Sequence, residues 1–209
     1  MPRGGLAPVP ATGYGGRVAR TWLSVTVELV EGAGYRFWPR PGRVFAAART
    51  HSFAQLATAI DVSFGRWDLG QLWQFELAGH VYVAPEDPEW QSAESDKILD
   101  GNSRLSRLAV GDEFVYQFDP NDSWLHICRV AEGRIDPLEE IGEAPPEPTA
   151  YDGWGILPDQ YLRRFADDDG ETPMPVDQRN RDLPPLRPWW GPNAAPVPGL
   201  ESMDRPSAG

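Results

Sequence analysis

Two carboxylates and an imidazole lie close together in the sequence, at Asp119, Asp122 and His126. Such groups bind divalent cations, and a water molecule on a bound cation can attack a phosphodiester or amide bond. One hypothesis is therefore a metal-dependent hydrolase with these three residues as metal ligands and catalytic groups, and with Glu147 or Asp152 as further ligands. The alternative is a turn in which both aspartates accept backbone N–H groups while His126 lies in a sheet. The turn is favoured because Asx turns are common and no second metal motif accompanies the cluster.

The other residues capable of chemistry are isolated in the sequence. His51 and His80 stand alone and are expected on the surface or in loops. Cys128 lies in a strand-like run with no helix start or basic residue near it in sequence, so it is expected to pack as a small hydrophobic residue. The sequence contains neither a Gly-x-Ser-x-Gly elbow nor a Gly-x-x-x-x-Gly-Lys phosphate loop. These observations argue against an enzyme, and no cofactor is expected unless a divalent metal binds.

Basic residues form one cluster in an otherwise acidic chain. The formal net charge is −12, and such a protein repels phosphate backbones. Nucleic acid is therefore disfavoured as a partner, except through the arginines around the second predicted strand, which are Arg36, Arg40, Arg43 and Arg49. A DNA-associated accessory protein using this patch is one further hypothesis. A solvated edge strand protected by charge explains the same residues equally well.

An apolar, proline-rich segment near the end of the chain is the candidate partner-binding motif. Residues 183–192 read Leu-Pro-Pro-Leu-Arg-Pro-Trp-Trp-Gly-Pro, and the residues expected to make contact are Pro185, Arg187, Trp189 and Trp190. Two adjacent tryptophans are costly to expose to water, and proline-stiffened segments lose little entropy on binding. The segment is therefore expected either to dock on its own domain or to bind a protein partner.

Composition divides the chain into a domain and two tails. The 21 glycines and 22 prolines are concentrated towards the ends, which predicts a flexible leader at 1–20, a domain at 21–165 and a disordered, proline-rich tail at 166–209. The single cysteine fits a reducing, cytoplasmic location. No run of eighteen apolar residues occurs, so no membrane association is expected.

Hydrophobic periodicity predicts the elements that would position these residues. Alternating runs predict strands at 22–30, 44–48, 73–77, 80–83, 113–119 and 124–130. A capping box at Ser52 and Gln55 starts a helix that Gly65 ends, and 158–165 is expected to form a second helix. The fold class is α+β, with a mainly antiparallel sheet and helices packed on one face. Most aromatic residues are expected in the core rather than on a stacking platform.

Two blocks of sequence resemble the plasmid pRiA4b ORF-3-like family. The first runs from Phe53 through Phe64-Gly65 and Trp67-Asp68 to Leu72-Trp73-Gln74-Phe75-Glu76, and the second is Tyr116-Gln117-Phe118-Asp119-Pro120-Asn121-Asp122-Ser123-Trp124-Leu125-His126. The resemblance covers roughly residues 22–165. It implies an α+β fold, an association with plasmids and mobile elements, and no established biochemical activity.

The chain departs from that family's pattern at several positions. Asn121 replaces a glycine of the second block, and asparagine is expected to tolerate the positive φ of a turn there. Histidines of the family pattern are replaced by Ala57, Gln71 and Trp73, and its later cysteine-containing segment is replaced by residues 144–151. If relatives use those side chains for metal binding or catalysis, this chain lacks them. The leading hypothesis is therefore a non-catalytic cytosolic interaction or accessory protein, and the metal-dependent hydrolase is the alternative.

Overall fold

The computed structural model describes residues 22–84, 98–133 and 135–161. The predicted leader and almost all of the predicted tail lie outside the described residues, and so do Pro185, Arg187, Trp189 and Trp190. The division at residues 20 and 165 therefore stays a prediction, as does the cytoplasmic location. Within the described part of the chain, no helix is both long enough and apolar enough to cross a membrane.

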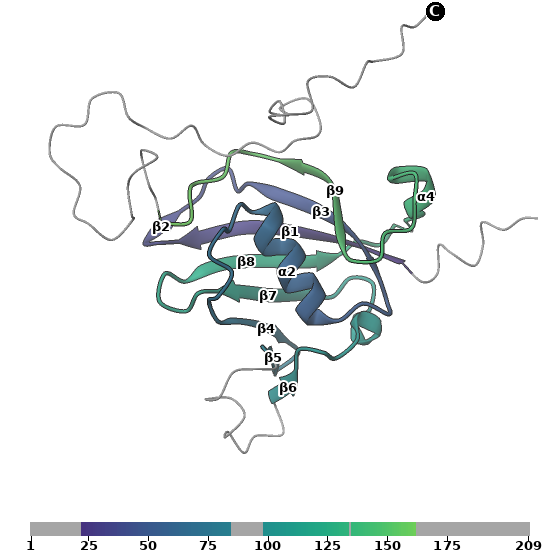
Figure 1. Cartoon of the computed structure of the whole chain (residues 1–209), viewed down its shortest axis with the longest axis horizontal. Helices are drawn as coiled ribbons and strands as arrows, with labels where there is room; N and C mark the ends of the chain where they lie inside the picture. Colours follow the sequence, from purple (N-terminus) through teal and green to yellow (C-terminus); the bar gives the residue numbers. More distant parts are fainter. Residues whose placement is uncertain (1–21, 85–97, 134, 162–209) are drawn as a thin grey trace, which may run out of the picture.

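One nine-stranded sheet forms the framework of the structure (Figure 1). Eight strands follow the order β6-β5-β4-β7-β8-β1-β3-β9, and β2 pairs with the end of β1. The strands are β1 (Trp22–Gly32), β2 (Tyr35–Arg36), β3 (Gly42–Ala48), β4 (Trp73–Leu77), β5 (His80–Val83), β6 (Ile98–Asp100), β7 (Glu113–Phe118), β8 (Trp124–Val130) and β9 (Thr149–Trp154). The sheet is mixed, because β5 and β6 are parallel whereas every other described pair is antiparallel.

Helix α2 (Phe53–Ser63) is the main helical element and lies over one face of the sheet (Figure 1). Its start agrees with the prediction: the Ser52 side chain accepts the Gln55 N–H, and the Gln55 side chain accepts the Ser52 N–H. Its end agrees too, because Gly65 follows the C-cap with a φ of +71°, a conformation that costs glycine little. The remaining described helices are short, namely the 3₁₀ turn η1 (Leu105–Arg107) and α4 (Pro137–Glu140).

The core lies between α2 and the sheet. On each central strand, alternate side chains point towards α2 and are fully or almost fully buried. The helix contributes an apolar stripe, and the sheet contributes aliphatic and aromatic side chains; the larger ones include Phe53, Leu56, Ile60, Phe64, Leu29, Phe45, Phe75, Phe114, Tyr116, Phe118 and Trp124. Most of the aromatics singled out in the sequence are therefore core residues, whereas Trp67 and Trp154 are exposed.

Three elements differ from the sequence predictions. Strand β9 was not predicted, and it pairs with β3 across a bulge between Val44 and Phe45. Strand β6 has three residues, too few to show any periodicity, and it depends on its parallel pairing with β5. Residues 158–161 do not form the predicted helix, and 162–165 lie outside the described residues.

Gly32 tests how tightly Trp124 is packed. A Cβ placed on Gly32 would lie 2.1 Å from Cε3 of the Trp124 ring, which is far inside van der Waals contact. Gly32→Ala should therefore destabilise the protein by about 1–3 kcal/mol through overpacking. Chemical denaturation followed by circular dichroism measures the change. Gly133→Ala is the matched control, because a Cβ there meets nothing within 4 Å; equal stability of the two variants would contradict the packing argument.

Candidate functional site

His126 lies in the middle of the core rather than at a surface cleft. It is on β8 opposite Tyr116 of β7, its ring centroid is 4.7 Å from that of Phe64, and its side chain has no solvent exposure. Among the described residues, no well-aligned hydrogen bond to either ring nitrogen is present, although the backbone of Tyr116 and of Trp124 interacts weakly with the ring. Burial lowers the pKa of His126 to about 3, and the positive charge of Arg66 acts in the same direction. The imidazole is therefore neutral at physiological pH.

Asp119 and Asp122 form the turn that leads into β8. The Asp119 carboxylate accepts the Asn121 N–H at 3.1 Å, and its backbone carbonyl accepts the Ser123 N–H at 2.7 Å. The turn forms with Asn121 in place of the family's glycine, as expected, and the positive φ values within it occur at Asp119 and Ser123 rather than at Asn121. Partial burial raises the pKa of Asp122, and the Asp119 charge contributes to the shift. This geometry agrees with the turn interpretation.

The described structure does not bring together Asp119, Asp122 and His126, the three residues of the alternative metal hypothesis. Among the described residues, no group of three or more histidine, cysteine, aspartate or glutamate side chains is arranged to hold a metal ion. The physical reason is that His126 points into the core under α2, whereas Asp122 lines a shallow surface pocket of about 190 Å³ beside the β1–β2 turn. The hydrolase hypothesis required these three side chains to lie together, and in the structure they do not.

A buried polar cluster is present instead, on the side of the sheet that α2 covers. The Tyr116 hydroxyl donates to the Asp61 carboxyl at 2.8 Å, which joins the sheet to the helix. Burial raises the pKa of Asp61 to about 8, although Tyr116 and Arg66 oppose the shift. The Asp61 carboxyl is thus mostly protonated at neutral pH. Asp61 lies four residues after Ala57 on the apolar stripe of α2, a position that could have drawn attention to it in the sequence.

Arg66 completes the cluster and was not predicted. It follows α2 by three residues, is only 4 % exposed, and its guanidinium carbon lies 3.6 Å from the centroid of the Trp124 ring. None of its three side-chain nitrogens has a hydrogen-bond partner among the described residues. Its chain neighbours Gly65 and Trp67 resemble a loop, so no sequence signal predicted that its side chain would be buried.

The other two histidines differ from each other. His51 is buried, and its Nδ1 accepts the Ala48 N–H at 3.1 Å, so the expected surface location is wrong although the residue does lie outside helices and strands. His80 is exposed on β5, as expected.

Cys128 is fully buried in β8, as predicted, and burial raises its thiol pKa far above the usual range.

The predicted basic patch is not a continuous surface. Arg43 is 1 % exposed, and its guanidinium bonds the carbonyl oxygens of Gly42, Ser63 and Trp154. Arg43 therefore ties α2 and β9 to β3 and is inaccessible to nucleic acid, contrary to expectation. The strand that carries it is not an edge strand either, because β9 covers it.

The remaining arginines of that patch lie apart. Arg36 is exposed on β2 and pairs with Glu31 at 3.2 Å. Arg49, beyond the far end of β3, donates to the Leu108 carbonyl at 2.7 Å, and Arg40 is half-buried before β3. With Arg43 buried between them, these side chains do not form one phosphate-binding surface.

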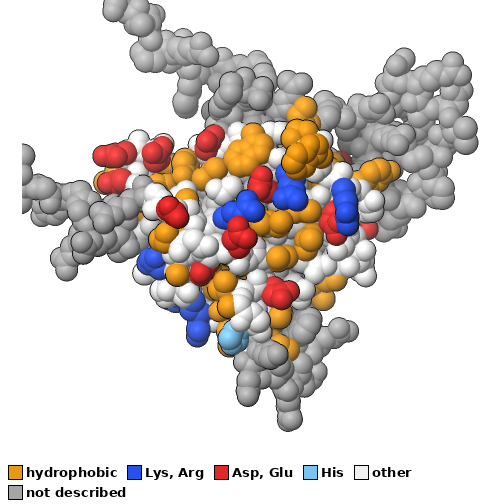
Figure 2. All heavy atoms as spheres, turned by 180° about the vertical axis from the view of Figure 1, so that it is seen from behind, with side chains coloured by type: hydrophobic (Ala, Val, Ile, Leu, Met, Phe, Trp, Pro, Cys, Tyr) orange, Lys and Arg blue, Asp and Glu red, His pale blue; other side chains and the backbone are white. Residues whose placement is uncertain are grey.

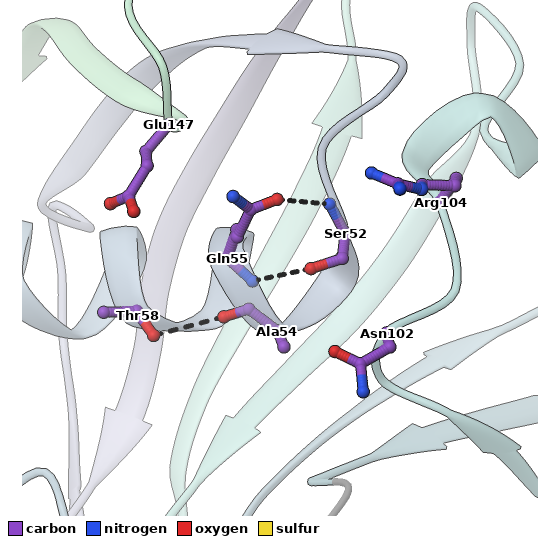
Figure 3. Close-up of a pocket in the computed structure, with 7 residues that line it drawn as sticks. All are labelled: Ser52, Ala54, Gln55, Thr58, Asn102, Arg104 and Glu147. Atoms are coloured by element: carbon purple, nitrogen blue, oxygen red, sulfur yellow. Dashed lines mark hydrogen bonds between the residues drawn. The ribbon is translucent and has the colours of Figure 1, made fainter.

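An open pocket of about 400 Å³ lies beside the N-terminus of α2 (Figure 3). Glu147 and Arg104 border it from opposite sides, and Asn102 lies below Arg104 in this view. The polar groups of Ser52 and Gln55 within it are already engaged in the capping box. The Ser52 hydroxyl and the Gln55 side-chain oxygen are therefore already used in capping the helix.

The face of the sheet opposite α2 is the open face. Its central strands present half-buried apolar side chains, namely Val44, Val115, Leu125 and Ile127. Arg129 lies between Glu28, at 3.3 Å, and Glu113, forming an ion-pair network on the same face. Figure 2, which views the molecule from behind, shows hydrophobic side chains interspersed with charged ones.

Comparisons with known proteins identify relatives but no activity. A sequence model of the family described as plasmid pRiA4b ORF-3-like protein matches residues 36–158, which is more than half of the chain. No curated protein matches the chain. Among solved structures, the chain is similar to a protein of unknown function, MM3350, from Methanosarcina mazei Go1. That similarity has 17% sequence identity and a TM-score of 0.46, and it covers 63% of this chain and 68% of the other.

The buried neutral imidazole predicts a specific loss of stability in acid. The pKa of His126 is about 3 in the folded protein and near its ordinary value of 6.5 when unfolded, so between these values only the unfolded state binds the proton. The stability that the protein gains from keeping His126 neutral is fully present above pH 6.5 and is lost as the pH falls. Between pH 7 and pH 5 this loss is about 2 kcal/mol.

The measurement compares the free energy of unfolding of the wild type and His126→Phe at both pH values. The wild type should lose about 2 kcal/mol more than the variant. The contribution of Asp61 to stability changes with pH in the opposite direction. Because the pKa of Asp61 is raised in the folded protein, stability is lost as the pH rises from about 4 towards 8. That contribution is common to both proteins and cancels in the comparison. An identical pH dependence would mean that His126 is not held neutral.

Proposed function

Because the chain belongs to the plasmid pRiA4b ORF-3-like protein family, for which no activity has emerged from the comparisons, we propose from its geometry that it is a non-catalytic interaction protein. The observation that carries the proposal is the contrast between its two sheet faces. Under α2, His126 and Cys128 are sealed in the core with no solvent exposure. On the other side, apolar side chains of the central strands remain half-buried.

The open face is the proposed binding surface. A peptide that covers Val44, Val115, Leu125 and Ile127 would complete the burial of these side chains, at about 25 cal/mol for each Å² of apolar area removed from water. The charged side chains interspersed among them, Glu28, Glu113 and Arg129, would set the orientation and favour a ligand with a positive charge.

The proposed ligand in the free protein is the chain's own segment 183–192. Its tryptophans, Trp189 and Trp190, supply apolar area, and Arg187 supplies a charge complementary to Glu28 and Glu113. The 21 residues 162–182 join Tyr161 to this segment. A chain of that length with the dimensions of a random coil would span roughly 25 Å, enough to reach across a small domain. Covalent linkage raises the local concentration of the segment to the millimolar range, which favours intramolecular docking. A protein partner bearing a similar segment would compete for the same face.

A labelled peptide tests this docking. A fluorescein-labelled peptide of residues 183–192 is titrated with full-length protein, and binding is followed by fluorescence anisotropy. The Trp189→Ala/Trp190→Ala protein should bind the peptide at least tenfold more tightly than the wild type, because its own segment no longer occupies the face. Wild-type protein that binds the peptide as tightly as the double variant would show that the face is not self-occupied.

A pair of lysine substitutions locates the binding surface. Ile127→Lys, introduced into the double variant, should weaken peptide binding at least tenfold, because it places a charge in the apolar part of the open face. Val62→Lys is the matched control, since Val62 is 59% exposed on α2, on the other side of the sheet. Retained binding with Ile127→Lys, or an equal loss with Val62→Lys, would reject the open face as the docking site.

A further inference from the structure

Arg66 is a buried cation whose hydrogen-bonding capacity is unused. Its Nε, Nη1 and Nη2 atoms are all buried, and none has a hydrogen-bond partner among the described residues. A guanidinium group carries five N–H donors and has no acceptor. Removing such a group from water without a partner is costly. The stacking of the guanidinium on Trp124, at 3.6 Å from the ring centroid, offsets only part of this cost.

The neighbours of Arg66 add further unpartnered nitrogens. Trp124 Nε1 is buried without a partner, and so are both ring nitrogens of His126, two residues along β8 on the same face. The indole N–H is a donor only, and the neutral imidazole supplies one donor and one acceptor. The cluster as a whole therefore has many donors and too few acceptors to satisfy them.

The acidic groups near Arg66 do not supply the missing acceptors. The Asp61 carboxyl accepts the Tyr116 hydroxyl and forms no ion pair with Arg66 within 4.0 Å. Because burial raises the pKa of Asp61 to about 8, this carboxyl carries little negative charge at neutral pH. Asp159 stabilises the charged guanidinium electrostatically. Within the described part of the chain, no acidic side chain forms a hydrogen bond with the Arg66 guanidinium.

We propose that Arg66, with Trp124 and His126 beside it, forms a binding site for a small oxyanion, a phosphate or a carboxylate. The guanidinium fork matches two oxygens of either group, and a bound oxyanion supplies only acceptors, which are what the cluster lacks. The site is separate from the open face, because Trp124 and His126 point to the side of the sheet that α2 covers.

The route to this site is short. Arg66 lies in the loop after α2, and the next residue, Trp67, is 50% exposed. This loop is held by the buried side chain of Gln160, whose Oε1 accepts the N–H groups of Trp67 and Asp68 at 2.9 and 3.0 Å. The same loop is also held by Tyr161, whose hydroxyl donates to the Asp68 carboxylate at 2.7 Å and whose ring contacts Trp67. A small anion therefore has to pass this loop rather than the sheet or the helix.

Calorimetric titration with anions tests the site in the full-length protein. Sodium phosphate and sodium acetate are titrated separately at pH 7 and constant ionic strength. The wild type should bind at least one of them with saturable 1:1 stoichiometry, and Arg66→Met should bind that anion at least tenfold more weakly. Arg36→Met is the matched control, because Arg36 is an exposed arginine, and it should bind like the wild type. Binding of phosphate alone or of acetate alone identifies which oxyanion the site accepts.

Thermal unfolding gives an independent readout. Without added oxyanion, Arg66→Met should melt at least as high as the wild type, because the substitution removes an uncompensated buried charge and keeps an apolar contact with Trp124. Added anion should raise the melting temperature of the wild type and of Arg36→Met by several degrees more than that of Arg66→Met. Arg66→Gln replaces Arg66→Met if the latter does not fold. No saturable binding of either anion by the wild type, or equal binding by the Arg66 variant, overturns the proposal.

Discussion

A short helix has to shield one face of a sheet much wider than itself, and the rest of the structure follows from this mismatch. Helix α2 has eleven residues and is about 16 Å long, whereas eight adjacent strands extend over roughly 34 Å. Large side chains fill the space on either side of the helix. Phe53 stacks on Tyr82 at 4.0 Å towards β5, and Trp124 lies near Phe37 and Arg66 towards the β1–β2 turn.

The same mismatch places polar groups inside the core. Asp61 and Tyr116 join helix and sheet through one buried hydrogen bond, and Arg43 bonds the last carbonyl of α2 together with the carbonyl of Trp154. In both cases a polar side chain reaches where no apolar side chain of α2 extends. Arg66 differs because it reaches the core without finding an acceptor. The proposed anion site depends on this difference between Arg43 and Arg66.

Covering one face also leaves the other face open. The described helices provide no second layer behind the central strands, so Val44, Val115, Leu125 and Ile127 remain half-buried. An ion-pair network around Arg129 limits how apolar this face is, which suits reversible contacts with a polypeptide better than permanent association. The two proposed sites therefore lie on opposite sides of the sheet and have different chemistry, one accepting a peptide and the other a small anion.

Local signals in the sequence were sufficient for most elements of the fold. The capping box at Ser52 and the glycine at position 65 delimit α2, and alternation predicted the central strands, because both signals depend only on neighbours in the chain. Tertiary contacts alone determined β9, whose residues become a strand only beside β3. They also determined which arginine side chains are buried and which of them form hydrogen bonds. Arg36, Arg43 and Arg66 look alike in sequence, yet one is exposed, one has acceptors and one is buried without any. The physical reason is that burial and hydrogen bonding of a long side chain depend on segments distant in sequence, such as Trp154 and Trp124, which only the folded sheet brings near.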